Sequence, residues 1–314
     1  MLNVKDRFTD LAFMQGDFQK VNTSPSQTSL PNWLWYIKYP LALHLQFKPE
    51  SPSISFMSGT AIHRYFQNIL MGKMKIADVE KFYKNILEHN KFSEKEYTKG
   101  TFILKIIKKM VINHLDILKE ISGDKMKDWE AEVSFSEWYN DTYMGQTLNI
   151  ANEGSIDCCN RSLKIFTEHK NRFPSVYLST AEKNKNKKVY NRRKPNKIKS
   201  PQFTHLIAVA MYSNHLGKDY EAGLIYCDED GAILFNKHNC DELKPEGLKY
   251  YYNKFIQINI QRQEMLRMAQ GDIKKLACMV GVDWSEIKKY KDNLFLSHMQ
   301  DEDMRKIERF YETL

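Results

Sequence analysis

Two carboxylates and a lysine at close spacing are the residues of this chain best suited to chemistry. Asp157 ends one short apolar run, Glu168 ends the next run eleven positions later, and Lys170 follows Glu168 by two positions. If the two runs pair as a hairpin, both carboxylates reach one edge of a sheet, where they repel each other unless a cation lies between them. Strand alternation puts Lys170 on the face of Glu168, so its ammonium can orient a water or stabilise charge on a phosphate. The spacing therefore predicts a Mg²⁺ or Mn²⁺ site beside a phosphate.

The same spacing also fits a solvated strand face with surface ion pairs, and three further features favour the metal site. His63 lies on a helical stretch that starts at Gly59, and Gln202 starts a later helix; either residue alone is typical of a surface. The third feature is a loop with nine Lys and Arg residues within 17 positions and almost no compensating acid, as phosphate binding requires. The nine are Lys183, Lys185, Lys187, Lys188, Arg192, Arg193, Lys194, Lys197 and Lys199.

The apolar pattern around these residues predicts an α/β domain. Helical spacing starts at Gly59 and continues to about residue 87, and a third helix is expected from a capping box at Ser93 to just before Gly123. Strands are expected over residues 130–135, 148–159 and 163–167, then a helix over 203–212 and a hairpin over 220–227 and 232–235. This order of elements predicts a mixed sheet flanked by helices.

The two ends of the chain differ from this predicted core of residues 58–240. Residues 1–57 are expected to be irregular, and 241–314 to form a helical extension. An aromatic cluster near the start is either a flap packed onto the core, which is the favoured interpretation, or a base-stacking surface. The cluster comprises Trp33, Trp35, Tyr36 and Tyr39. Near the end, Ala277, Gly281 and Ile287 have the spacing of a helix-turn-helix, although an ordinary helical hairpin is the stronger expectation.

Composition narrows the class of protein. The chain has 314 residues, 42% of them hydrophobic and 27% charged, as in a soluble globular protein. Its net charge of +8 favours a polyanionic partner. The first residues lack the apolar core of a signal peptide and no run approaches a membrane helix, so we expect a cytoplasmic protein with no membrane partner. Five cysteines without a C-x-x-C pair signal neither zinc nor an iron–sulfur cluster, and the adjacent Cys158 and Cys159 are expected to be reduced on opposite strand faces.

Taken in order, these motifs resemble those of the PD-(D/E)XK nucleases, and within them the RecB-like exonuclease branch. The chain is similar to the mitochondrial genome maintenance exonuclease group and to related exonucleases of marine phages, over roughly residues 30–240. It departs from the family at the Gln-x-x-x-Tyr motif, where Leu206 takes the tyrosine position and Tyr212 is the next tyrosine downstream. The matching motifs are Gly59-Thr60-x-x-His63, Gly154-x-Ile156-Asp157, Glu168-x-Lys170 and Gln202.

The resemblance implies a PD-(D/E)XK restriction-endonuclease-like core with N- and C-terminal helical additions. It also implies roles for particular residues. The metal ligands would be His63, Asp157, Glu168 and the backbone carbonyl of His169. Lys170 would be the catalytic lysine and Gln202 would organise the site, while Glu132, on the strand before Asp157, is a secondary candidate.

The activity that the resemblance implies is Mg²⁺- or Mn²⁺-dependent hydrolysis of DNA at single-stranded or otherwise free ends. It would serve phage-type replication, recombination or host DNA degradation, in the host cytoplasm if the protein comes from a phage. No iron–sulfur cluster is expected, because the cysteine ligands of that branch are absent. Three alternatives stay open: a structure-specific endonuclease, a non-catalytic single-stranded DNA-binding protein, and an RNA-directed nuclease.

Overall fold

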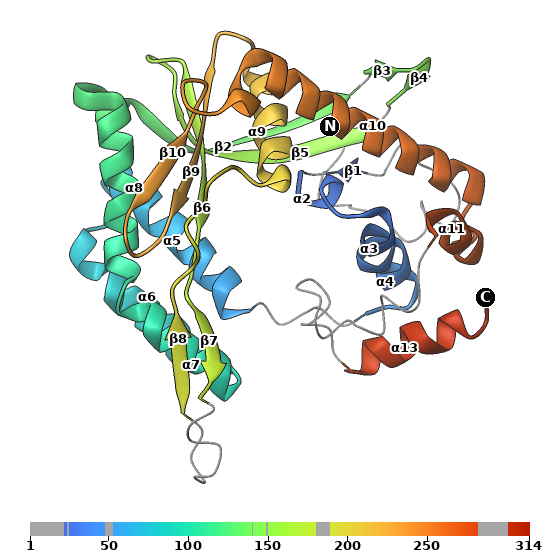
Figure 1. Ribbon diagram of the computed structural model, residues 1–314, viewed down its shortest axis with the longest axis horizontal. Coiled ribbons are helices and arrows are strands. Elements are labelled where there is room, and N and C mark those ends of the chain that lie inside the picture. Colours follow the sequence, from blue (N-terminus) through green and yellow to red (C-terminus); the bar gives the residue numbers. More distant parts are fainter. Residues whose placement is uncertain are drawn as a thin grey trace.

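A mixed sheet lies between two groups of helices in the computed structural model of the chain (Figure 1). The structure describes residues 22–23, 25–47, 53–139, 141–148, 150–179, 189–281 and 301–314. The predicted α/β class, with helices on both faces of a mixed sheet, is confirmed. No helix among these residues is both long and apolar enough to cross a membrane.

The sheet places β5 and β6 at its centre, in the order β1-β5-β6-β9-β10, with β2 also paired to β5. β5 runs antiparallel to β2 and β6, whereas β6 runs parallel to β9. The strands are β1 (Asn22–Thr23), β2 (Trp129–Tyr139), β5 (Ile150–Asn160), β6 (Ile165–Asn171), β9 (Glu221–Cys227) and β10 (Ala232–Phe235). Two separate ribbons pair β3 (Thr142–Tyr143) with β4 (Gln146–Thr147), and β7 (Ser175–Leu178) with β8 (Tyr190–Arg193).

The first group of helices covers one face of the sheet. It comprises α5 (Ile54–Leu70), η3 (Ile76–Asp78), α6 (Val79–His89), α7 (Glu94–Leu104), α8 (Ile107–Ser122) and η4 (Gly123–Asp128). The expectation of one helix from Ser93 to Gly123 is wrong, because the chain bends at residues 105–106. At Gly100 a Cβ would lie 2.5 Å from Leu87, so the backbone of α7 packs closely on α6, while α8 turns away to lie against β9 and β10.

The second group covers the other face and joins both ends of the chain. From the C-terminal part it contains α9 (Phe203–Leu216), η5 (Asp241–Leu243), α10 (Pro245–Ala269), α11 (Ile273–Val280) and α13 (Asp301–Tyr311). From the N-terminal part it contains α2 (Pro25–Thr28), α3 (Asn32–Tyr36), η2 (Ile37–Leu41) and α4 (Ala42–His44). Residues 25–47 are thus largely helical, which corrects the expectation of an irregular segment, and α5 begins at Ile54 rather than Gly59. The division at residues 57 and 240 stays a prediction.

Proline content suggested irregularity where the chain is helical. Pro31 occupies the N-cap position of α3, where a missing backbone N–H costs no helical hydrogen bond. Pro40 lies inside η2, a π-helical turn whose wider ladder accommodates it. Ser53 caps α5 by accepting a hydrogen bond from the backbone N–H of Phe56. The prolines that suggested breaks therefore lie at the start of a helix or within a π-helical turn.

The aromatic cluster packs into the core. Trp35 is 2% exposed and Tyr36 is fully buried, and the Tyr36 hydroxyl donates to the carbonyl of Ile273 at 3.0 Å. The guanidinium of Arg262, on α10, lies 4.9 Å from the Trp35 ring. Arg262 also donates to the backbone oxygens of Gln27 and Leu30 and to the side chain of Asn32. The interpretation as a flap on the core is confirmed for Trp35 and Tyr36, which are too buried to stack on bases.

Two further expectations concern cysteines and the C-terminal helices. Cys158 and Cys159 are both buried and free, and they face different cores on opposite sides of the sheet, as alternation predicts. α11 ends where Gly281 takes a left-handed φ of 65°. Ile287, the last position of the helix-turn-helix spacing, lies outside the described residues.

Candidate active site

The β5–β6 hairpin brings Asp157 and Glu168 together. The strands pair from Asn160 and Ile165 to Cys158 and Thr167, and the next position on each strand is Asp157 and Glu168. Asp157 Oδ1 lies 3.1 Å from His63 Nδ1, and Asp157 Oδ2 accepts a hydrogen bond of 2.7 Å from the backbone N–H of His169. Asp157 therefore contacts His63 of α5 and the backbone of His169, and Glu168 lies opposite it on β6.

Glu168 and Lys170 share one face of β6, as strand alternation predicts. Lys170 Nζ donates to Glu168 Oε1. Glu168 is 4% exposed, and its second oxygen, Oε2, is buried with no hydrogen-bond partner among the described residues. A buried carboxylate oxygen without a hydrogen-bond partner costs free energy, so Oε2 is the oxygen of this group best suited to accept a cation.

The two carboxyl groups have opposite shifts in pKa. Burial, reinforced by the charge of Asp157, raises the pKa of Glu168 to about 7, and the charge of Lys170 only partly opposes this. Burial also disfavours charge on Asp157, but the charge of His63 and its hydrogen bond outweigh burial and hold the Asp157 pKa below its usual range. Burial opposes the charge of Lys170 too, yet Glu168 and Asp157 raise the Lys170 pKa above its ordinary value. Lys170 is therefore a cation and a hydrogen-bond donor at neutral pH.

Glu132, the secondary candidate, lies beside this group on β2. Its neighbours Ala131 and Val133 pair with Cys158 and Ile156, so Glu132 is opposite Asp157. Glu132 adopts a φ of 53°, a conformation that residues other than glycine rarely take and that occurs preferentially at functional sites. Gln67 lies one turn after His63 on α5, and with its amide turned to suit its neighbours its nitrogen donates to the His63 carbonyl at 3.2 Å and to Glu132 Oε1 at 3.0 Å. Sequence reasoning missed Gln67, although its helical spacing from His63 pointed to it.

Gln202 occupies the N-cap of α9, as predicted, but its exposed side chain forms no cap bond. Its backbone N–H donates to the Tyr226 hydroxyl at 2.9 Å, and that hydroxyl lies 2.7 Å from His205 Nδ1. Tyr226 is the partner of Lys170 in the β6–β9 ladder. A tyrosine from β9 thus reaches the start of α9, whereas Leu206, at the tyrosine position of the motif, is buried in the core.

Gly154 allows two aromatic rings to approach β5 closely. A Cβ at this position would lie 2.4 Å from the Phe135 ring and 3.0 Å from the Tyr212 ring. Tyr212 is buried and packs edge-on against Phe135 and Phe166. Tyr212 therefore supports the core beneath β5.

The basic segment is only partly described. Lys183, Lys185, Lys187 and Lys188 lie outside the described residues. Arg192 bonds Glu229 at 3.0 Å and Lys194 bonds Asp230 at 2.7 Å, so the expectation of almost no compensating acid is wrong for these two. The acids come from the turn between β9 and β10, over thirty positions later in the sequence. The other three described members, Arg193, Lys197 and Lys199, are exposed and make no salt bridge with any described residue.

A buried histidine that sequence reasoning missed lies behind β6. His114, on α8, places Nδ1 2.8 Å from His169 Nδ1 and Nε2 2.8 Å from Asn171 Oδ1. His169 Nε2 in turn lies 2.9 Å from the Thr167 hydroxyl. Burial lowers the pKa of His114 to about 4, so its imidazole is neutral. The sequence signal was a histidine within the apolar stripe of residues 107–118.

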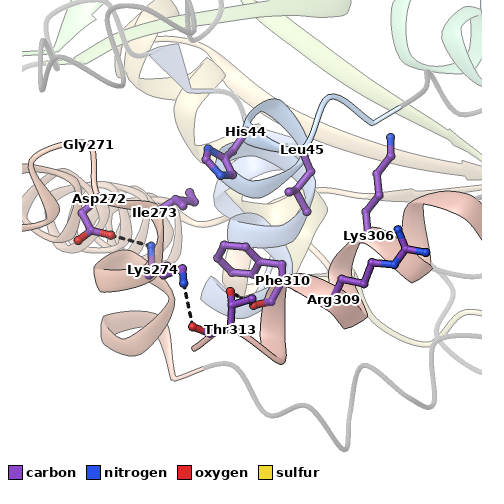
Figure 2. A pocket seen from close by; sticks show the side chains of 10 residues that line it. All are labelled: His44, Leu45, Gly271, Asp272, Ile273, Lys274, Lys306, Arg309, Phe310 and Thr313. Carbon is purple, nitrogen blue, oxygen red and sulfur yellow. Dashed lines mark hydrogen bonds between the residues drawn. The ribbon is translucent and has the colours of Figure 1, made fainter.

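A cavity of about 640 Å³ lies elsewhere, between α4, α11 and α13 (Figure 2). Its lining includes Ile273, Phe310 and Leu45, together with basic side chains such as Lys274 and Arg309. Lys274 Nζ donates to the backbone carbonyl of Thr313 at 2.8 Å (Figure 2). No residue of the Asp157–Glu168 site lines this cavity.

The donor set suits a hard divalent cation, although the side chains bond one another as they stand. In the described parts of the chain, no group of three or more His, Cys, Asp or Glu side chains is arranged to hold a metal ion. His63 instead contacts Asp157, and Glu168 contacts Lys170. Glu168 Oε2, the second lone pairs of Asp157, the carbonyl of His169 and His63 Nε2 are nevertheless the oxygen and nitrogen donors that Mg²⁺ and Mn²⁺ take.

No family model matches this chain, and no curated protein matches it. Among solved structures, one described as "Crystal structure of SSO0001" aligns with 59% of this chain and 88% of its own, at 15% identity and a TM-score of 0.25. A similarity at that level carries no argument about fold or function.

Proposed function

We propose that this protein is a metal-dependent DNA exonuclease with a PD-(D/E)XK core, acting at single-stranded ends. The observation that carries the proposal is the buried Oε2 of Glu168, which has no hydrogen-bond partner in the described part of the chain and lies opposite Asp157, with His63 and Lys170 in the same group. A surface ion pair, the alternative interpretation of the same spacing, does not require an unsatisfied buried carboxylate oxygen.

Mg²⁺ or Mn²⁺ would be held by His63, Asp157, Glu168 and the carbonyl of His169. When bound, such an ion lowers the pKa of a water ligand and neutralises charge on the scissile phosphate. Asp157 fixes the neighbouring groups, because its two oxygens accept from His63 and from the His169 amide. These bonds hold β5, α5 and β6 in fixed positions relative to one another at the proposed site of cleavage.

Lys170 acts as a charged donor in the proposed reaction. Because its pKa is raised, it keeps its proton and cannot serve as a general base at neutral pH. Its ammonium can donate to the attacking water or to a phosphate oxygen, which stabilises the charge that develops there. Gln202, exposed at the start of α9, would contact the same phosphate, and the backbone N–H groups of this helix end favour an anion.

Exposed residues beside the site support a nucleic-acid substrate. Phe56 is 68% exposed on α5, seven positions before His63, so both side chains lie on one helical face about two turns apart. An exposed aromatic ring can stack on an unpaired base. Arg193, at the end of β8, and Lys197 and Lys199, between β8 and α9, add positive charge that no described acidic residue pairs with. Phe56 thus takes the stacking role that the buried Trp35 and Tyr36 cannot fill.

The alternatives differ in the substrate they act on or in whether they cleave it. A structure-specific endonuclease would use the same residues on DNA without ends, and an RNA-directed nuclease would use them on a different strand. A non-catalytic single-stranded DNA-binding protein would use only Phe56 and the basic residues. Metal dependence and the need for an end distinguish these cases.

The decisive test uses linear single-stranded DNA labelled at either end, the same sequence as a circle, and a matched RNA. Each is incubated with Mg²⁺, Mn²⁺ or EDTA, for the wild type and for Lys170→Ala. We expect metal-dependent degradation of linear DNA alone, absent in the variant. The end whose label is released first gives the polarity of degradation. Cutting of the circle would replace the exonuclease by an endonuclease, and preferred loss of RNA would change the substrate. Binding without cleavage would overturn the proposal in favour of a binding protein.

A further inference from the structure

The segment of β6 that carries Glu168 and Lys170 has no ladder pairing with β5. β6 pairs with β9 along its full length, but its pairing with β5 ends at Thr167. Beyond that point the His169 amide donates to the Asp157 carboxylate instead of to a strand. The sheet ladder therefore holds residues 168–171 from the β9 side alone.

His114 holds the opposite face of that segment. His169 and Asn171 flank Lys170, and strand alternation turns both away from Glu168 and Lys170, toward α8. His114 bonds both of them at 2.8 Å from a fully buried position. One side chain of α8 therefore spans the two strand positions on either side of the proposed catalytic lysine.

The hydrogen bonds fix each ring in one state. Asn171 Oδ1 only accepts, so His114 Nε2 carries a proton and its Nδ1 accepts from His169 Nδ1–H. His169 Nε2 then accepts from the Thr167 hydroxyl. Phe66 of α5 packs 4.9 Å from both imidazoles. Each ring nitrogen has one partner, so neither ring can rotate without losing a buried bond.

Core packing alone does not account for a histidine here. A phenylalanine would fill the same space against Phe66 without the desolvation that burying an imidazole costs. We propose that His114 is a positioning residue, which sets the direction of Glu168, the His169 carbonyl and Lys170 by holding His169 and Asn171. This inference rests on the proposed function, because it assigns the fixed segment to binding a divalent cation.

The test compares His114→Phe with two partial replacements. His114→Asn can replace only the bond of Nδ1 to His169, and His114→Gln only the bond of Nε2 to Asn171. Met110→Ala is the matched control, since Met110 lies one turn earlier on the same helix and is equally buried. The readouts are Mn²⁺ affinity of the DNA-free protein by calorimetry, urea stability, and kcat and KM on linear single-stranded DNA.

We expect His114→Phe to weaken Mn²⁺ binding by roughly 10- to 100-fold, the usual effect of losing a group behind a metal ligand. kcat should fall while KM for DNA changes little, and Asn or Gln should restore part of the affinity. Met110→Ala should lose stability without weakening Mn²⁺ binding. Wild-type Mn²⁺ affinity in His114→Phe, or an equal loss in Met110→Ala, would overturn the inference.

Different results would overturn the exonuclease proposal and the positioning role of His114. A wild type that binds Mn²⁺ through this segment but cleaves no nucleic acid would remove the exonuclease and keep the positioning role. A wild type that degrades DNA, with His114→Phe unchanged in Mn²⁺ affinity and kcat, would keep the exonuclease and remove the positioning role.

Discussion

Asp157 and Glu168 face each other across the open end of the β5–β6 hairpin, but their carboxylates are held differently. Both oxygens of Asp157 accept hydrogen bonds, whereas one oxygen of Glu168 bonds Lys170 and the other is buried without a partner in the described residues. Their pKa values shift in opposite directions, to about 7 for Glu168 and below the usual range for Asp157. Neighbouring carboxyls with separated pKa values are typical of functional sites.

Metal addition should stabilise the fold through this pair. A ligand that binds only the folded state stabilises it by about 2.7 kcal/mol at a hundred times its Kd. We expect Mn²⁺ to raise the free energy of unfolding of the wild type by this amount, measured in urea with EDTA as reference. Asp157→Asn should lose most of the increment, while Asp219→Asn, an exposed carboxylate paired with Lys164, should keep it. An unchanged increment in Asp157→Asn would place the metal elsewhere.

Replacement of Lys170 should separate catalysis from binding. Lys170→Ala removes the ammonium that bonds Glu168, and we expect the cleavage rate to fall by at least roughly 100-fold, the effect of losing a charge-stabilising donor. DNA affinity in EDTA, measured by fluorescence anisotropy, should change little. Lys164→Ala, which removes a surface lysine just before β6, is the control and should cleave normally. Equal loss of binding and cleavage in Lys170→Ala would contradict the assigned role.

The basic residues should divide into two classes. Arg193, Lys197 and Lys199 make no salt bridge with a described residue. Changing all three to Gln should therefore weaken DNA binding and flatten its salt dependence. Arg192 and Lys194 already bond Glu229 and Asp230, and their replacement should change the salt slope less and the stability more. A combined change of Lys183, Lys185, Lys187 and Lys188 tests the rest of the segment. An unchanged slope in every variant would exclude this segment from the DNA path.

Phe56 should contribute to binding by stacking. Phe56→Ala is expected to weaken binding of single-stranded DNA by about 1–3 kcal/mol, the range for one base on one aromatic ring. Duplex DNA with blunt ends should be less affected, because its bases are already stacked. Tyr250→Ala removes a comparably exposed ring from α10 and serves as the control. Equal losses in both variants would mean that exposure alone, and not position beside His63, explains the effect.

His205 should make the protein less stable in acid. Burial, and then the charge of Lys170, lowers the pKa of His205 to about 3 in the folded state. Below about pH 6.5 the unfolded chain gains a proton that the folded protein does not, so stability falls as pH decreases from about 6.5 toward 3. His205→Asn should give a shallower loss of unfolding free energy between pH 7 and 5. Tyr226→Phe keeps the buried imidazole and should retain the wild-type slope.

The meeting of the central side chains was predictable because it depends on strand alternation. Asp157, Glu168 and Lys170 needed only a hairpin with the right turn to meet, and the pattern of Cys158 and Cys159 on opposite faces follows from the same two-residue period. Only the resemblance grouped His63 with these residues, because helical spacing cannot show that α5 lies beside β5.

What the sequence did not reveal depends on contacts between distant segments. Glu229 and Asp230 pair with Arg192 and Lys194 only because the β9–β10 turn folds back beside β8. His114 looked like part of an apolar helix, and its role required knowing that α8 lies behind β6. The N-terminal helices were missed for a related reason: Pro31 and Pro40 suggested a loop, whereas packing against α10 and α11 holds that segment in helical turns.

Arg262 has a consequence for how the chain is made. Its guanidinium holds the carbonyls of Gln27 and Leu30 and the side chain of Asn32, partners at least 230 residues earlier in the sequence. A ribosome must therefore synthesise most of the protein before the first helices can acquire their native contacts. Until α10 emerges, Trp35 and Tyr36 have no core to enter, and the newly made N-terminal part exposes apolar surface that chaperones recognise.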